Sequence, residues 1–158
     1  MELATARLRL RRPTRAEAEA LAAGTPLAST RCLDGYPTPD TFDAFAPYLD
    51  GRRPEPPWLI VRAADGFAIG DIGLAPRDRP EVATGGYGLA TAAWNQGYAT
   101  EALIALIDYT WRTFPEVTRI ELDALPGNIA SRRVMEKAGL QLHHEDHELA
   151  LYVLHRPC

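Results

Sequence analysis

The sequence has few cysteines and no long apolar run, and each shortage excludes a class of protein. Cys32 and Cys158 are the only cysteines in 158 residues, and they have neither metal-ligand spacing nor the frequency of a disulfide-stapled chain. No apolar run approaches the roughly 20 residues that span a bilayer, and the first residues alternate leucine with arginine, unlike a signal peptide. We therefore expect a cytoplasmic protein without a metal site or a membrane partner.

Excess positive charge is also lacking. The formal net charge is −4 at pH 7, whereas proteins that bind nucleic acid usually carry a basic balance or a basic stripe. Arginines do gather near the start of the sequence, at positions 7, 9, 11, 12 and 15, but most such runs are solvated faces. We interpret this group in that way and do not expect nucleic acid as a partner.

What is present is the composition of one globular domain. Hydrophobic residues make up 46% of the chain and charged residues 24%, which is ordinary usage for a soluble domain. A chain of this length forms one good core more readily than two. We expect a single domain over residues 1–158, as a monomer or a homodimer.

Alternating and three-to-four-residue patterns indicate an α/β protein. Alternation predicts strands at 5–11, 58–62, 67–74, 83–89, 119–124, 140–144 and 147–156. Helical periodicity with start and stop signals predicts helices at about 14–23, 40–49, 100–114 and 128–138, with Asp40 capping the second. The mixture of six to seven strands with about four helices points to one sheet with helices packed against it.

The most informative segment lies directly before the third predicted helix. It runs Trp94, Asn95, Gln96, Gly97, Tyr98, Ala99, Thr100. The first turn of a helix has backbone N–H groups without intrahelical partners and the positive end of the macrodipole, so it can hold a phosphate without a basic side chain. Gly97 and Ala99 leave the main chain open to ligand oxygens. The segment therefore predicts a pyrophosphate site; an ordinary loop with a glycine turn is the alternative.

Two further segments carry chemistry. Asn128 precedes a short helix and is a good N-cap, so capping alone would explain it. Gly85, Gly86 and Gly88 stand in one predicted strand, and such glycines mark a bulge or a place where a ligand comes close. They do not form a dinucleotide fingerprint, because the spacing Gly-x-Gly-x-x-Gly is missing.

Together these segments resemble the GNAT superfamily of acetyl-CoA-dependent N-acetyltransferases, in particular its RimJ/RimL-like branch. The matching positions follow in order and spacing: Thr5–Arg11, Gly86, Tyr87, Leu89, Trp94–Leu103, Asn128, Ala130, Ser131, Val134, Glu136, Lys137 and Gly139. The superfamily's pyrophosphate motif is Gln/Arg-x-x-Gly-x-Gly/Ala, and here Trp94 takes its first position and Ala99 its last. The resemblance implies a mostly antiparallel twisted sheet whose fourth strand is splayed and bulged to receive the pantetheine arm.

The resemblance also implies roles for particular residues. Residues 94–100 would bind the pyrophosphate of acetyl-CoA, and the backbone N–H groups around Leu89 would stabilise the oxyanion. Asn128 would hold the pantetheine or the acceptor side, and Ser131 would give a proton to the departing sulfur, unless it only satisfies a helix start. Arg133 or Lys137 would reach the 3′-phosphate.

The general base and the acceptor remain open at this stage. Where many relatives carry a strand glutamate, this chain has Ala83 and Thr84; the alternatives are Glu121, Asp123, His143, Glu145, His147 and solvent. The acceptor amine is a protein N-terminus, a lysine or a small molecule, selected by loops at 25–36, near Pro54 and in the final hairpin. The missing acid leaves a second function class, a non-catalytic acyl-CoA-binding module; an NAD-binding protein is a distant third.

Overall fold

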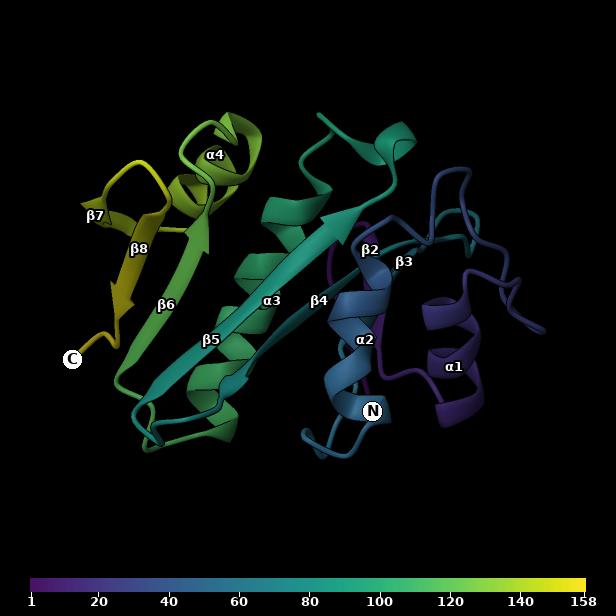
Figure 1. The fold of residues 1–158 in the computed structure, drawn as a ribbon, viewed down its shortest axis with the longest axis horizontal. Helices are drawn as coiled ribbons and strands as arrows, with labels where there is room; N and C mark the ends of the chain where they lie inside the picture. Colours follow the sequence, from purple (N-terminus) through teal and green to yellow (C-terminus); the bar gives the residue numbers. More distant parts are fainter. The chain divides into compact units, whose positions relative to one another are not determined.

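The computed structural model describes residues 1–158 (Figure 1). It confirms an α/β chain, which contains eight strands, four α-helices and one short 3-10 helix. The elements in chain order are β1 (Glu2–Ala4), β2 (Leu8–Arg11), α1 (Arg15–Ala23), α2 (Thr41–Leu49), β3 (Trp58–Arg62), β4 (Ala68–Pro76), β5 (Val82–Leu89), η1 (Thr91–Ala93), α3 (Tyr98–Thr113), β6 (Arg119–Ala124), α4 (Ile129–Lys137), β7 (Gln141–Glu145) and β8 (Ala150–His155).

The strands form one sheet in the order β1-β2-β3-β4-β5-β6-β8-β7. Every pair with a described register is antiparallel except β5 with β6, which are parallel. The mostly antiparallel sheet was therefore predicted correctly, but the expected six to seven strands fall short of the eight observed. The additional strand is β1, which pairs Glu2 with Arg11 and Leu3 with Leu10. Three residues are too few to show an alternation by themselves.

The chain divides into two compact units. The first comprises Met1–Gly73 and Tyr87–Ala102, and in it α1 and α2 pack around a core that includes Leu21, Phe45 and Leu59. Helix α1 has the predicted bounds because Thr14 and Glu17 form a capping box at its start, and Gly24 ends it in the left-handed region.

The start of α2 differs from the prediction. Asp40 stands at the N-cap position, but its backbone is helical and its side chain makes no capping hydrogen bond. Two threonines bond to the backbone just before the helix: Thr41 Oγ1 accepts a hydrogen bond from the Thr38 N–H at 2.9 Å, and Thr38 Oγ1 accepts one from the Asp40 N–H at 3.3 Å. Asp40 therefore occupies the predicted cap position, but the prediction that its side chain caps the helix was wrong, because its backbone is helical where a capping residue is extended.

The second unit comprises Leu74–Gly86 and Leu103–Cys158. The part of α3 in it buries Leu103, Leu106 and Ile107, as the periodicity predicted. Arg156 stabilises the end of α3. Its guanidinium donates hydrogen bonds to the carbonyl oxygen of residue 111 in the last turn and to those of residues 114 and 117 just after the helix. The helix spans Tyr98–Thr113, whereas the sequence predicted about 100–114.

The final strands complete this unit. β6 pairs with β8 along all six of its residues, and β7 pairs with the other edge of β8 (Figure 1). Tyr152 at the middle of β8 is fully buried. Its hydroxyl forms hydrogen bonds with Arg132 and Glu136 on α4.

Candidate functional site

The loop between β5 and α3 exposes main chain rather than side chains. Asn95 and Gly97 both have positive φ, 61° and 81°, so the chain turns sharply before the helix. Trp94 folds back and donates from Nε1 to the Leu89 carbonyl oxygen at 2.9 Å, and Gln96 donates to the Ala92 carbonyl oxygen at 3.1 Å. Because both side chains form hydrogen bonds within the loop, a ligand bound there would contact the backbone.

The backbone N–H groups at the start of α3 fit an anion. The first helical hydrogen bond runs from the Glu101 N–H to the Gly97 carbonyl oxygen, at 3.0 Å. The N–H groups of Tyr98, Ala99 and Thr100 precede it and have no partner within the helix. Together with the macrodipole they give this loop the donors and the partial charge that bind a phosphate.

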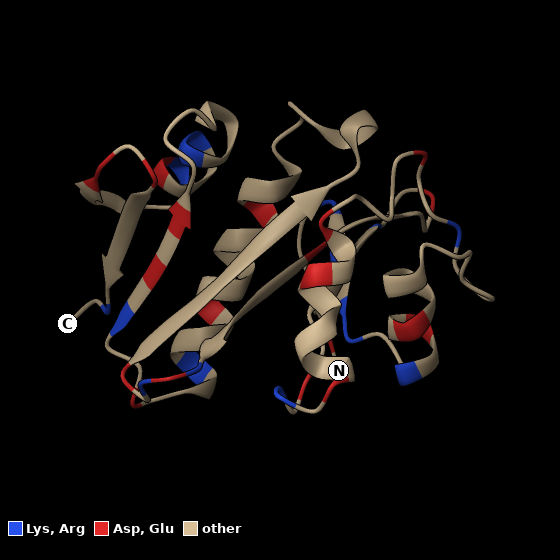
Figure 2. Ribbon diagram, in the orientation of Figure 1, with Lys and Arg blue, Asp and Glu red and all other residues tan.

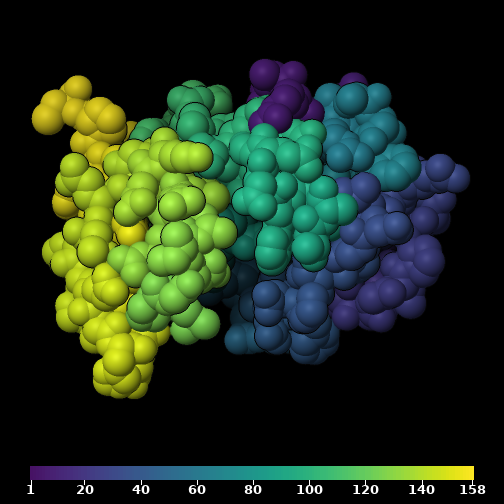
Figure 3. All heavy atoms as spheres, turned by 90° about the horizontal axis from the view of Figure 1, so that it is seen from above, coloured from purple at the N-terminus to yellow at the C-terminus, as the bar shows by residue number.

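The N-terminal segment braces the same helix start. Glu101 accepts hydrogen bonds from Thr5 Oγ1 and from the backbone N–H and Nε of Arg7, the latter two at 2.8 Å. Arg7 also lies over the ring of Tyr98, 4.3 Å from its centroid. Burial disfavours ionisation of Glu101, but the bonds from Thr5 and Arg7 outweigh it and lower its pKa. In the space-filling view the purple N-terminal atoms lie against the segment near residue 100 (Figure 3).

The N-terminal arginines were interpreted as a solvated face, and Arg7, Arg9 and Arg15 are indeed exposed, but Arg11 and Arg12 are half-buried. Arg11 pairs with Glu17 at 2.8 Å, and Arg12 lies 4.1 Å from the centroid of the Trp58 ring. Both side chains have partners within the fold, and so does Arg7, although its side chain is 45% exposed. The alternation of leucine and arginine in the sequence shows the two faces of a strand, but it does not reveal which arginines find partners elsewhere in the fold.

β5 comes unusually close to β4 at one point. A Cβ added to Gly70 would lie 2.2 Å from the Gly88 carbonyl oxygen and 3.1 Å from Leu89 Cα, so only glycine fits there. Sequence reasoning missed Gly70, although a glycine inside a strand is the usual signal of such an approach. By contrast, a Cβ on Gly86 would meet nothing within 4 Å. β5 also pairs with β6 only from Val82 to Thr84. The glycine-rich part of β5 thus has open space on it.

The predicted residues of the second unit lie on α4. Asn128 caps the helix, its Oδ1 accepting a hydrogen bond from the Ser131 N–H at 3.2 Å. Ser131 is half-buried, and Arg133 and Lys137 are exposed. The structure brings Asn128 and Ser131 together at one helix end, as the sequence predicted. The capping role is confirmed; ligand roles for these four residues stay predictions.

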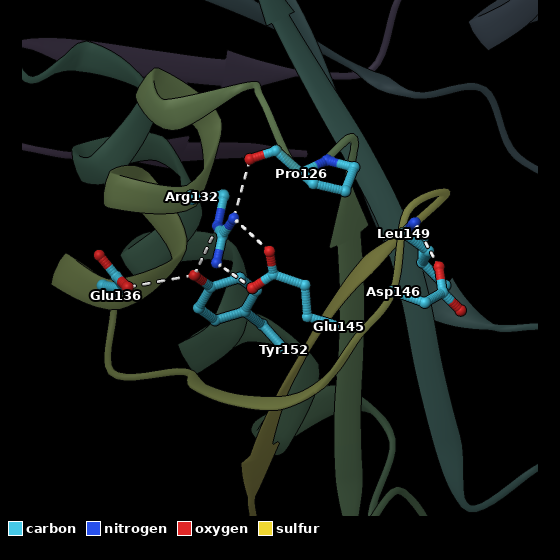
Figure 4. A network of polar contacts seen from close by, with 7 residues as sticks. All are labelled: Pro126, Arg132, Glu136, Glu145, Asp146, Leu149 and Tyr152. Atoms are coloured by element: carbon cyan, nitrogen blue, oxygen red, sulfur yellow. Dashed lines mark hydrogen bonds and ion pairs between the residues drawn. The ribbon is translucent and has the colours of Figure 1, made fainter.

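A polar network fixes α4 to the final hairpin (Figure 4). Arg132 donates from Nη2 to Glu145 at 2.7 Å, from Nη1 to the Pro126 carbonyl oxygen at 2.8 Å and from Nε to the Tyr152 hydroxyl at 3.1 Å. That hydroxyl in turn donates to Glu136 at 3.1 Å. Arg132 thus links the first turn of α4, which contains Ser131, to Pro126 before the helix and to Glu145 and Tyr152 of the final hairpin.

The proposed acids and bases of this unit are mostly exposed or paired. Figure 2 shows two acidic positions along β6 after a basic one; these are Glu121 and Asp123, following Arg119. Glu121 forms ion pairs with Arg119 at 2.5 Å and with Arg79 at 3.1 Å. Glu145 is engaged by Arg132, and Asp123, His143 and His147 are exposed. None of these groups combines burial with an open proton-accepting position.

One acid that the sequence reasoning passed over is buried in the first unit. Asp71 on β4 is 6% exposed; its Oδ2 accepts a hydrogen bond from the Tyr36 hydroxyl at 2.9 Å, and Thr41 Oγ1 lies 3.5 Å from the same oxygen. Burial raises the pKa of Asp71 to about 6. A lone carboxylate between Ile69 and Ile72 was the available sign, since acids are rare in buried strands.

The loop at 25–36 lines a cavity in the first unit. Its wall consists of residues 24–32 with Asp34, Tyr36, Pro37 and Phe67. The expected acceptor loop therefore does border a hollow, although its selectivity stays a prediction. Across the whole chain no helix is long and apolar enough to cross a membrane. No group of three or more His, Cys, Asp and Glu side chains is arranged to hold a metal ion.

Comparison with known families and proteins agrees with this geometry. Residues 7–141 match the family model described as an acetyltransferase (GNAT) domain. Among curated proteins, the probable N-acetyltransferase YjcK of Bacillus subtilis is 37% identical over 82 residues, which are 51% of this chain and 45% of YjcK. The chain spans about half the length of the curated relatives it matches.

Solved structures share the fold over nearly the whole chain. A GNAT-family acetyltransferase from Bacillus anthracis superposes with a TM-score of 0.72 at 20% identity, covering 98% of both chains. RimL, described as a ribosomal L7/L12 alpha-N-protein acetyltransferase in complex with coenzyme A, has a TM-score of 0.71 at 18% identity and the same coverage. At these identities the likeness establishes the fold.

Proposed function

We propose, because the chain belongs to the acetyltransferase (GNAT) family, that it transfers an acetyl group from acetyl-CoA to a primary amine by direct attack in a ternary complex. The observation that carries the proposal is the loop before α3, where positive φ at Gly97 and three unpartnered helix N–H groups leave a backbone anion site. Acetyl-CoA presents a pyrophosphate that fits such a site.

The remaining parts of the cosubstrate have candidate contacts. The open side of the glycine-rich end of β5 would receive the pantetheine arm, with backbone N–H groups around Leu89 as oxyanion donors. Arg133 or Lys137, both exposed on α4, would bind the 3′-phosphate. The bound acetyl-CoA supplies the activated acyl group, so the protein's task is to orient the amine and manage protons.

Asn128 and Ser131 are the proposed catalytic residues of α4. Asn128 would hold the pantetheine or the acceptor through its amide, and Ser131 would give a proton to the departing thiolate. Asn128→Asp separates the two uses of this side chain, since aspartate caps a helix as well as asparagine but cannot donate. We expect unchanged stability and slower transfer; unchanged transfer would leave Asn128 as a cap alone. Ser131→Ala should slow single-turnover transfer, while Ser131→Thr, which keeps the hydroxyl, should not.

The acceptor is a primary amine on a peptide N-terminus, a lysine or a small molecule. The structural neighbours include proteins described as ribosomal-protein acetyltransferases, which supports testing peptide N-termini first. The cavity beside the loop at 25–36 is lined by Asp34, which would attract a cationic amine, and by Arg31, which would oppose it.

Calorimetry with acetyl-CoA, beside desulfo-CoA and NAD, tests the proposal first. We expect micromolar binding of acetyl-CoA and no binding of NAD. Release of CoA thiol is then measured with alanyl, seryl and methionyl tripeptide amides, an N-terminally blocked lysyl peptide and spermidine. Binding without release for any amine would favour the non-catalytic acyl-CoA-binding module. No binding would refute both functions.

A further inference from the structure

A line of hydrogen-bonding side chains leads from the buried carboxyl of Asp71 to β5. Thr41 Oγ1 lies 3.5 Å from Asp71 Oδ2 and 3.2 Å from Thr38 Oγ1. Thr38 Oγ1 in turn lies 3.9 Å from the position a Cβ would take on Gly88. Asp71 and Thr41 are buried and Thr38 is half-buried. The line therefore runs from the interior of the first unit to the open main chain of β5.

We propose that Asp71 is the base of the transfer reaction, and that Thr41 and Thr38 relay the amine proton to it. The inference rests on the proposed function, which puts the thioester against β5 at Leu89, the residue after Gly88. β5 has no acid of its own from Val82 to Leu89. Asp71, on the neighbouring strand β4, supplies the carboxylate that β5 lacks.

The protons and electrons balance along this line. Thr38 Oγ1 accepts a proton from the substrate ammonium while its own proton passes to Thr41 Oγ1, and the Thr41 proton passes to Asp71 Oδ2. The neutral amine then forms the C–N bond to the acetyl carbon. The C–S bond breaks with its electron pair on sulfur, and the second amine proton leaves with CoA as the thiol. Asp71 finally releases its proton to solvent by the reverse path.

The surroundings of Asp71 suit a base that works near neutral pH. Burial raises the pKa of this carboxyl, hydrogen bonds from Tyr36 and Thr41 oppose the rise, and the negative charge of Asp40 adds to it. Burial also raises the pKa of Tyr36, beside Cys32, so Tyr36 stays a hydrogen-bond donor. A base whose pKa lies near the working pH accepts a proton most efficiently in the transition state.

The pH profile of kcat/KM is the measurement that tests the relay. It uses whichever tripeptide amide, lysyl peptide or spermidine the wild type acetylates. The wild type should lose activity on the acid side with an inflection near pH 6. Asp71→Asn should lower kcat/KM at pH 7.5 at least tenfold and remove that inflection, with unchanged affinity for acetyl-CoA and no fall in Tm. Asp43→Asn, on the exposed face of α2, is the matched charge control and should keep the parent profile.

Variants that leave the carboxyl in place separate a relay from a structural anchor. Thr38→Val should lower kcat/KM about tenfold, and Thr38→Ser, which keeps the hydroxyl, should restore it, although Thr38 reaches Asp71 only through Thr41. Tyr36→Phe removes a hydrogen bond that lowers the pKa of Asp71, so the inflection should move to higher pH. Asp40→Asn removes a repelling charge, so it should move to lower pH.

The outcomes distinguish the relay from the proposed function. An active wild type whose Asp71→Asn or Thr38→Val variant keeps the parent profile overturns the relay and leaves acetyl transfer standing. Parallel shifts for Tyr36→Phe and Asp40→Asn overturn it in the same way. A wild type that neither binds acetyl-CoA nor releases CoA overturns the proposed function, and the relay with it. Opposite shifts, with rescue by serine at position 38, support the relay.

Discussion

Replacing Gly70 by alanine tests how tightly β4 and β5 approach each other. The new Cβ would lie 2.2 Å from the Gly88 carbonyl oxygen, 2.7 Å from Leu89 Cδ2 and 3.1 Å from Leu89 Cα. The leucine methyl can rotate away, but the carbonyl oxygen and Cα are backbone. Because non-bonded heavy atoms normally lie roughly 3.5 Å apart or more, β5 must move by about 1 Å. Overpacking of this kind costs about 1–3 kcal/mol, and we expect the upper end because no flexible side chain can absorb it.

Urea denaturation of Gly70→Ala beside Gly86→Ala measures that magnitude. Both variants add the same methyl group to a strand of the same sheet, but at Gly86 it meets nothing within 4 Å. We expect the free energy of unfolding to fall by about 3 kcal/mol for Gly70→Ala and to change by less than about 0.5 kcal/mol for Gly86→Ala. Equal losses in the two variants would refute the close approach. Gly70→Ala should also weaken acetyl-CoA binding, since it displaces Leu89.

Three further predictions follow from local contacts. Gly97→Val forces a branched residue to a φ of 81° and brings its Cβ within 3.3 Å of Arg7 Nη2; the strain is at least about 1–2 kcal/mol, and calorimetry should show acetyl-CoA bound at least about tenfold more weakly. Glu17→Gln keeps the capping box but loses the ion pair with Arg11, whose hydrogen bond lowers the pKa of Glu17 below 4.5. The ion pair stabilises the fold above that pH, so the variant should lose about 1 kcal/mol of stability at pH 7. This difference should vanish as the pH falls through the folded-state pKa of Glu17, which thermal melts at pH 7 and 3 will show. Tyr152→Phe should lower stability by about 1 kcal/mol in urea denaturation, because its hydroxyl serves both Arg132 and Glu136.

Local signals in the sequence predicted the loop and α4 well. Gly97 adopts positive φ, and Asn128 caps its helix, because both outcomes depend on residues within one turn. Helix α1 follows its capping residue for the same reason. At α2 the cap position was predicted correctly but the side-chain cap was not, since Asp40 has a helical rather than an extended backbone.

Features that depend on distant parts of the chain were missed. Asp71 contacts Tyr36, which lies 35 residues earlier, and the Arg7–Glu101 pair joins positions 94 residues apart. Gly70 matters only because Gly88 passes beside it. The periodicity of the sequence does not indicate these long-range contacts, since they depend on which strands become neighbours in the sheet. A single polar residue in an apolar strand and a glycine in its middle were the only hints.

The buried carboxyl on β4 makes the folded protein less stable at neutral pH than it would be with an uncharged residue at the same position. Because the pKa of Asp71 is about 6 in the folded chain against an ordinary 3.8, the native state binds the proton more tightly than the unfolded state does. Stability therefore rises as the pH falls through 6, and ionisation above it costs about 3 kcal/mol. Selection of this protein for thermal resistance alone will favour an uncharged residue at position 71, and on the relay proposed above its activity will be lost with the charge.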